Sequence, residues 1–215
     1  MKKNMLLGII AIAVIGVVIG GYFLFRNTAT KDALRFKEEY EALNSELNDD
    51  GSHKYTKLSI EKNNKIVYLS YEDVVDFANN GTGLLYFGRP GCPWCRLLVP
   101  TLLSFAKEKN INIYYYDIES DRDENNDKYK NILSLFGEYL PIDTVTQKED
   151  DPDFDENLKR VVLPQLFFMK DGLVKDELYA YQHDYLKNNE SNKMHQLLFD
   201  KYESIINSCS AKNDC

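Results

Sequence analysis

The hydrophobic positions of this chain begin with one long run and then break up into short segments. No charged side chain occurs between Met5 and Phe25, and as a helix this run would span the roughly 30 Å core of a bilayer. A cleaved secretory signal has a shorter apolar region followed by small residues, whereas this run ends in bulky aromatic side chains. We therefore predict an uncleaved signal anchor over residues 5–25, with residues 1–4 in the cytoplasm and the remaining chain outside.

Beyond the anchor, the spacing of apolar residues alternates between helical and strand-like patterns. Residues 26–53 contain a helical pattern from 31 to 48, which predicts either a stalk or a helix docked on the domain that follows. Residues 54–207 form that domain, and residues 208–215 are a polar C-terminal tail. Apolar runs between turn residues predict strands at 57–60, 66–69, 83–87, 111–116, 161–168 and 173–181. Helical spacing predicts helices after Ser70 and over 93–109, 129–140 and 192–207.

The net charge of the chain argues against one class of function. The formal net charge is −8, and the absence of a basic face argues against nucleic-acid binding. Acidic residues gather over 149–156, where Asp151, Asp153 and Asp155 match the first ligand positions of a calcium loop. However, Glu156 and Val162 stand where such a loop needs glycine and glutamate. We therefore predict a solvated acidic loop rather than a metal site.

The segment with the clearest chemistry is Gly91-Cys92-Pro93-Trp94-Cys95, which lies between a predicted strand and a predicted helix. A cysteine at a helix N-terminus is stabilised as a thiolate by free backbone N–H groups and the helix dipole. Arg89 and Arg96 flank the motif and should lower the pKa of Cys92 further. Cys95 follows one turn later, close enough to attack a mixed disulfide. This arrangement predicts thiol–disulfide exchange.

Two other interpretations of the paired cysteines are weaker. A zinc site would need a second pair of ligands at close spacing, but Cys209 and Cys215 are too far apart, and His53, His183 and His195 show no paired spacing. A purely structural disulfide across one helical turn would constrain little of the unfolded chain. On the extracytoplasmic side, four cysteines favour disulfides. Local spacing favours Cys92 with Cys95, and Cys209 with Cys215, the latter as a structural bond or a second redox pair.

Three features together resemble the thioredoxin family over residues 54–207. They are the Cys92–Cys95 motif after a strand, Pro100 within the following helix, and Val162-Leu163-Pro164 before a strand and the Lys170-Asp171-Gly172 turn. The resemblance implies an α/β, thioredoxin-like fold with a central mixed β-sheet flanked by helices. It also implies a cis Leu163–Pro164 bond facing the cysteines. The string from Tyr86 to Arg96 is similar to membrane-anchored thioredoxin-like proteins of Gram-positive bacteria, some of which are labelled bacteriocin transport accessory proteins.

The chain departs from the thioredoxin pattern at two places. Tyr86 occupies the position where thioredoxins carry a buried acid that assists the second cysteine. The dipeptide between the cysteines is Pro93-Trp94 rather than Gly-Pro, and we expect Trp94 to be an exposed contact residue. Both departures leave the direction of electron flow open.

The motif and the resemblance together predict an extracytoplasmic thiol–disulfide oxidoreductase of a bacterial cell membrane, with a role in redox homeostasis. Cys92 and Cys95 are the expected catalytic, redox-active pair, and the expected substrate contacts are Pro93, Trp94, Leu163 and Pro164. The expected partners are protein or peptide thiols and disulfides and a membrane redox protein, without a cofactor or metal. The alternative is a redox-inert thioredoxin-like module that assists export or assembly of secreted peptides.

Overall fold

The computed structural model describes residues 29–48, 51–123, 125–148, 150–179 and 190–207. Its helices are α2 (Lys31–Ala42), α3 (Tyr71–Asn80), α4 (Pro93–Lys109), α5 (Asp127–Phe136), the 3₁₀ helix η1 (Gly137–Tyr139) and α7 (Ser191–Asn207). Its strands are β1 (Ile66–Tyr68), β2 (Gly83–Gly88), β3 (Ile113–Asp117), β4 (Gln165–Lys170) and β5 (Leu173–Tyr179).

The five strands form one mixed sheet in the order β1-β3-β2-β4-β5. Strands β1 and β2 both run parallel to β3 between them, whereas β4 runs antiparallel to β2 and to β5. Each parallel connection crosses the sheet through a helix, as parallel pairing requires. The sheet places the end of β2 beside the start of β4, where Phe87 pairs with Gln165. The functional residues discussed below lie at this end of the sheet.

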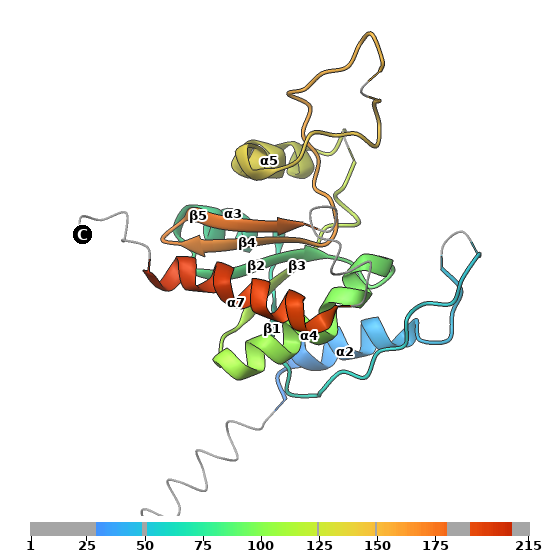
Figure 1. Cartoon of the computed structure of the whole chain (residues 1–215), viewed down its shortest axis with the longest axis vertical. Coiled ribbons are helices and arrows are strands. Elements are labelled where there is room, and N and C mark those ends of the chain that lie inside the picture. The colour runs from blue at the N-terminus through green and yellow to red at the C-terminus, as the bar shows by residue number, and fades with distance from the viewer. Residues whose placement is uncertain (1–28, 49–50, 124, 149, 180–189, 208–215) are drawn as a thin grey trace, which may run out of the picture.

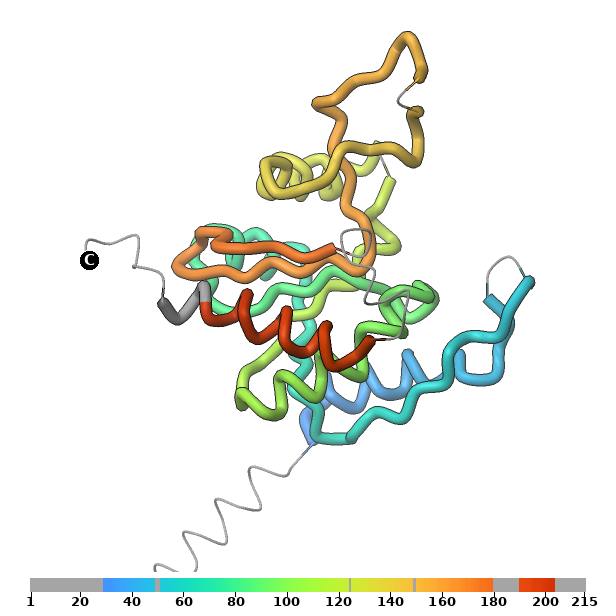
Figure 2. The backbone as a smooth tube through the Cα atoms, in the orientation of Figure 1, coloured from blue at the N-terminus to red at the C-terminus, as the bar shows by residue number. Residues whose placement is uncertain are grey.

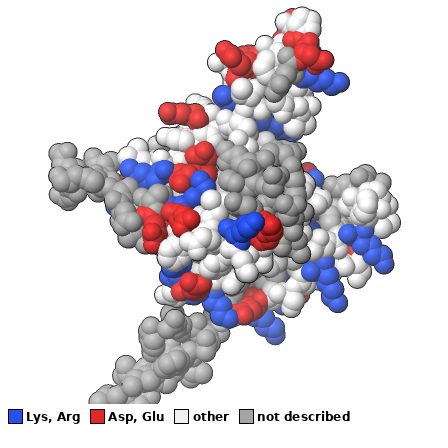
Figure 3. Space-filling model, in the orientation of Figure 1, with Lys and Arg blue, Asp and Glu red and all other residues white. Residues whose placement is uncertain are grey.

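Helices cover both faces of the sheet (Figure 1). Helices α2, α4 and α7 pack on one face through a core that includes Phe36, Leu102 and Leu198, while α3 and α5 pack on the other through residues such as Val74 and Ile132. The α/β class and the mixed sheet flanked by helices are therefore confirmed. The loop between η1 and β4 projects from the α5 side (Figure 1) and carries both acidic and basic side chains (Figure 3).

Local chemistry explains where several elements begin and turn. Ser70 and Asp73 form a capping box at the start of α3, where the sequence predicted a helix. At the β4–β5 turn, Asp171 and Gly172 have φ of 51° and 77°, which glycine and aspartate tolerate better than most residues. A side chain at position 172 would meet the Asn79 carbonyl oxygen at 2.1 Å, so glycine is also required there by space.

The predicted strand at 57–60 is wrong: this segment belongs to no strand of the described chain. Figure 2 shows it returning along α2 as an extended trace. Its backbone is held by side chains instead, because Asn44 bonds both the N–H and the carbonyl of Leu58, and Glu41 accepts from the N–H of Ile60. Buried Leu58 and Ile60 explain the strand-like pattern.

The other elements differ from expectation mainly at their ends. The first helix ends at Ala42 rather than at residue 48. Asn44, which follows it, uses its side chain to donate to the Leu58 carbonyl. The strand predicted over 111–116 spans Ile113–Asp117, and the helix predicted over 129–140 ends as η1. Pro164 precedes β4 rather than lying inside it, because a proline has no N–H to donate to the sheet.

Several predictions lie outside the described residues, namely the anchor over 5–25 and the Cys209 and Cys215 pair. Within the described ranges, no helix is long and apolar enough to cross a membrane.

Candidate functional site

Cys92 lies at the junction that the sequence predicted, between β2 and α4. It is the N-cap residue of α4, and its sulfur accepts the backbone N–H of Cys95 at 3.2 Å. The Cys92 thiol faces the carbonyl oxygen of Leu163 at 3.8 Å, and the Leu163–Pro164 bond is cis. Cys92 is 6% exposed, so the residue has little contact with solvent.

The other residues of the motif differ in their exposure. Cys95 is fully buried and Pro93 is exposed. Trp94 is half-buried and packs against the cores on both faces of the sheet, so the expectation of an exposed contact residue is only half met. Both cysteines are free thiols in this structure.

The two thiols have opposite electrostatic environments. The pKa of Cys92 is lowered, chiefly by a hydrogen bond from the Cys95 thiol and further by the Cys95 and Trp94 backbone N–H groups and by Arg89, against the effect of burial. The pKa of Cys95 is raised well above its ordinary value, chiefly by burial and then by its hydrogen bond with Cys92. The geometry therefore distinguishes a nucleophilic thiol from a protonated one.

Alkylation of the reduced chain should reflect this difference. Because alkylation consumes the thiolate, the lowered pKa of Cys92 should shift the rise of its rate to lower pH than for an unperturbed cysteine. Iodoacetamide labelling followed by peptide mass spectrometry over a pH series should find Cys92 modified first near neutral pH. Faster labelling of Cys95 would reverse the assignment of roles.

Tyr86 contacts the buried thiol from β2. Its hydroxyl hydrogen-bonds with the Cys95 sulfur, which opposes the rise in the pKa of that thiol, and lies 3.2 Å from the hydroxyl of Tyr40. Space for the ring comes from Gly88, where a side chain would lie 2.4 Å from the Tyr86 hydroxyl. Burial raises the pKa of Tyr86 well above its ordinary value, so the hydroxyl stays protonated and donates. The buried thiol of Cys95 thus faces a neutral donor from β2.

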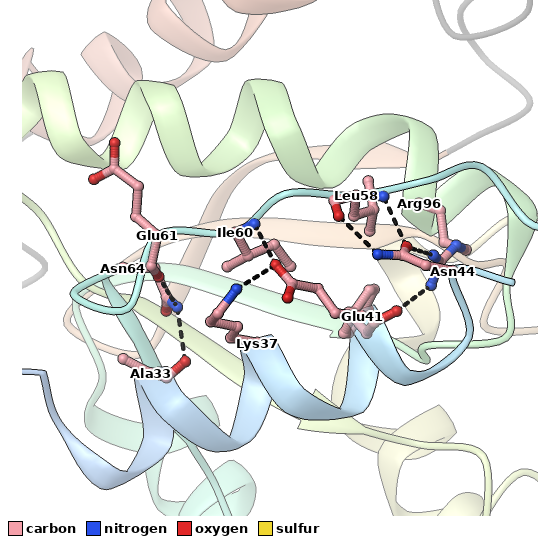
Figure 4. Close-up of polar contacts among 10 residues, drawn as sticks. Ala33, Lys37, Glu41, Asn44, Leu58, Ile60, Glu61, Asn64 and Arg96 are labelled. Carbon is pink, nitrogen blue, oxygen red and sulfur yellow. Dashed lines mark hydrogen bonds and ion pairs between the residues drawn. The ribbon is translucent and has the colours of Figure 1, made fainter.

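Arg96 does not act on Cys92 as the sequence suggested. Its side chain is fully buried and points to the segment after α2, where it donates to the backbone carbonyls of Tyr40 and Thr56 and to the Asn44 side chain at 2.7–3.0 Å. Figure 4 shows this clamp between α4, α2 and the returning segment. The prediction that Arg96 lowers the pKa of Cys92 is therefore corrected, and the arginine beside Cys92 that does lower it is Arg89.

A cleft of about 130 Å³ opens beside Cys92. Its lining is Arg89, Cys92, Pro93, Arg122, Val145, Val162 and Leu163. Pro93 and Leu163 were predicted to contact substrate, and the structure brings both to the Cys92 sulfur. Arg122 and Val145 were not predicted, because they lie in polar segments whose place in the fold has no local signal.

The acidic loop has no metal-binding arrangement in the part of the chain that is described. No group of three or more potential ligands among His, Cys, Asp and Glu occurs there. The side chain of Asp151 accepts from the Asp153 N–H, and that of Asp155 accepts from the Asn157 N–H. These carboxylates bond the backbone of their own loop.

No model of a protein family matches the chain. Solved structures that are similar to it include two thioredoxins of Arabidopsis thaliana. Thioredoxin O2 is 20% identical over 62% of this chain and 95% of its own, with a TM-score of 0.36. Thioredoxin O1 is 21% identical over 62% and 97%, with a TM-score of 0.35. The J-Trx1 fragment of ERdj5 is 16% identical over 65% and 52%, with a TM-score of 0.35.

Proposed function

We propose that this chain is a thiol–disulfide oxidoreductase with a thioredoxin-like fold, acting on protein or peptide substrates. The observation that carries the proposal is the asymmetric Cys92–Cys95 pair at the start of α4. Cys92 has a lowered pKa and lies at a cleft, whereas Cys95 is buried with a raised pKa. A purely structural pair of cysteines needs neither the asymmetry nor the cleft.

In the reducing direction, the Cys92 thiolate attacks one sulfur of a substrate disulfide and expels the other as a thiolate, which takes up a proton. Cys95 then loses its proton and attacks the Cys92 sulfur. The substrate leaves as a dithiol, and the chain keeps a Cys92–Cys95 disulfide after passing on two electrons. The oxidising direction is the reverse of these steps. The Tyr86 hydroxyl stabilises the Cys95 thiolate while it forms.

The proposal is tested by an exchange assay with the full chain. The chain should accelerate either the reduction of a model protein disulfide by dithiothreitol or the oxidation of a reduced substrate. A reduction potential of about −270 mV would indicate a reductase, and one of about −120 mV would indicate an oxidant. No acceleration in either direction would favour the redox-inert accessory module in export or assembly of secreted peptides.

We further propose that residues 5–25 anchor the domain on the extracytoplasmic side of a bacterial membrane. The support is the uncharged length of this run. Mass spectrometry of the mature protein from the membrane fraction should recover peptides that contain residues 5–25. A mature chain that starts near Thr28 would instead identify the run as a cleaved signal.

A further inference from the structure

Two arginines, Arg89 and Arg122, line the cleft beside Cys92, and they differ in whether their charge is paired. Arg89 is paired with Glu119 at 3.0 Å. Within the described residues, the side chain of Arg122 forms no ion pair or hydrogen bond, although its backbone N–H donates to Ile118, and its buried Nε has no partner. A partly buried guanidinium without a counter-charge attracts an anion. The arginine is thus available to a carboxylate that enters the cleft.

A second cavity of about 660 Å³ continues from this cleft. The two share Val145 and Val162, and the second cavity extends past Ile142 to Tyr179 on β5. Val145 is 60% exposed and Ile142 is 36% exposed, which leaves apolar surface open to solvent. The shared walls make one groove that runs from the Cys92 sulfur to the sheet edge.

The outer wall of the groove is held in place by its own contacts. Asp143 is 3% exposed and accepts from the Val145 and Thr146 N–H groups, the Thr146 hydroxyl and Arg160. Ile142 also pairs with Lys159 across the base of the loop. The wall that carries Val145 is therefore fixed before any partner arrives.

We propose that this groove binds an extended segment of a partner protein that carries an acidic side chain next to its reactive cysteine and an apolar side chain a few residues away. The acidic side chain faces Arg122, and the apolar side chain enters the cavity of Val145, Val162 and Tyr179. The inference rests on the proposed function and names its substrate class. Since Cys92 is 6% exposed, only a segment that fits the groove brings its sulfur to the thiolate.

The test uses the reduced full chain and peptides whose single cysteine is linked to 2-thiopyridine. Cys92 attacks the peptide sulfur and releases 2-thiopyridone, and Cys95 then releases the peptide thiol, so the rate is read from absorbance. Peptides with Glu, Gln or Lys next to the cysteine should rank in that order, with Glu about tenfold faster than Lys at low salt and less so at high salt. Each peptide also carries a Leu a few residues from its cysteine. Replacing this Leu by Ser should slow the reaction of the wild-type chain, but not that of a chain in which Val145 is changed to Ser.

Charge variants separate the possible outcomes. Arg122→Gln should abolish the preference for Glu, while Arg122→Lys and the distant, exposed Arg35→Gln should keep it. Equal rates for the Glu and Lys peptides would overturn the groove proposal and leave the oxidoreductase proposal standing, whereas no reaction with any peptide would overturn both. A concentration-dependent dimer lost in Arg122→Gln would show that the occupant is the acidic loop of a second copy, which also overturns the proposal.

Discussion

Replacing Cys92 by serine should reduce thiol–disulfide exchange to the uncatalysed background. A serine hydroxyl stays protonated at neutral pH, so the variant lacks the thiolate that attacks the substrate disulfide. Cys92 accepts the Cys95 N–H and faces Leu163, and no other described cysteine reaches the cleft. The measurement is the exchange assay on the full chain, with the folded state checked by circular dichroism.

Two further variants show whether the loss is specific. Cys95→Ser should keep the nucleophile but lose the resolving thiol, so a mixed disulfide with Cys92 should accumulate on non-reducing gels. Changing Cys209 and Cys215 together to serine should leave exchange near the wild-type rate. Full activity of the Cys92→Ser chain would remove the proposed mechanism, and a large loss in the double variant would mean that the C-terminal pair relays electrons.

Replacing the buried Arg96 by alanine should strongly destabilise the fold. Its fully buried side chain donates to Tyr40, Thr56 and Asn44. We expect a loss on the order of 3–5 kcal/mol in the free energy of unfolding, because the buried Tyr40 carbonyl loses its donor at about 1–3 kcal/mol and the part-buried bonds to Thr56 and Asn44 are lost as well. Urea unfolding of the full chain, followed by fluorescence, measures this loss.

The matched control is another arginine with an exposed ion pair. Arg35 bonds Glu39 at 2.7 Å with its side chain 58% exposed, so Arg35→Ala should cost less than about 1 kcal/mol. Arg96→Lys keeps the charge but not the planar fork, so its stability should lie between wild type and Arg96→Ala. Equal stability of the Arg35→Ala and Arg96→Ala chains would show that the clamp does not hold the segment after α2.

The sequence was most informative where the local structure depends on neighbouring residues along the chain. The start of α4 at Pro93, the capping box of Ser70 and the turn at Asp171 and Gly172 each depend on a few adjacent residues. The predicted elements were wrong where contacts with residues distant in the sequence hold the backbone. Residues 57–60 have the apolar pattern of a strand, but the side chains of Asn44 and Glu41 hold their backbone.

By itself, the sequence predicted Cys92 and Cys95 as the reactive pair and placed them at the start of a helix, because their spacing and the helix that follows are local properties. It also predicted that Leu163 and Pro164 approach the cysteines, through resemblance to a family. Only the tertiary structure decided that Arg89 faces Cys92 while Arg96 points away. It likewise placed Tyr86 at the buried thiol and Arg122 in the cleft. These roles depend on which side chains from separate segments share one space, and no spacing along the chain encodes that.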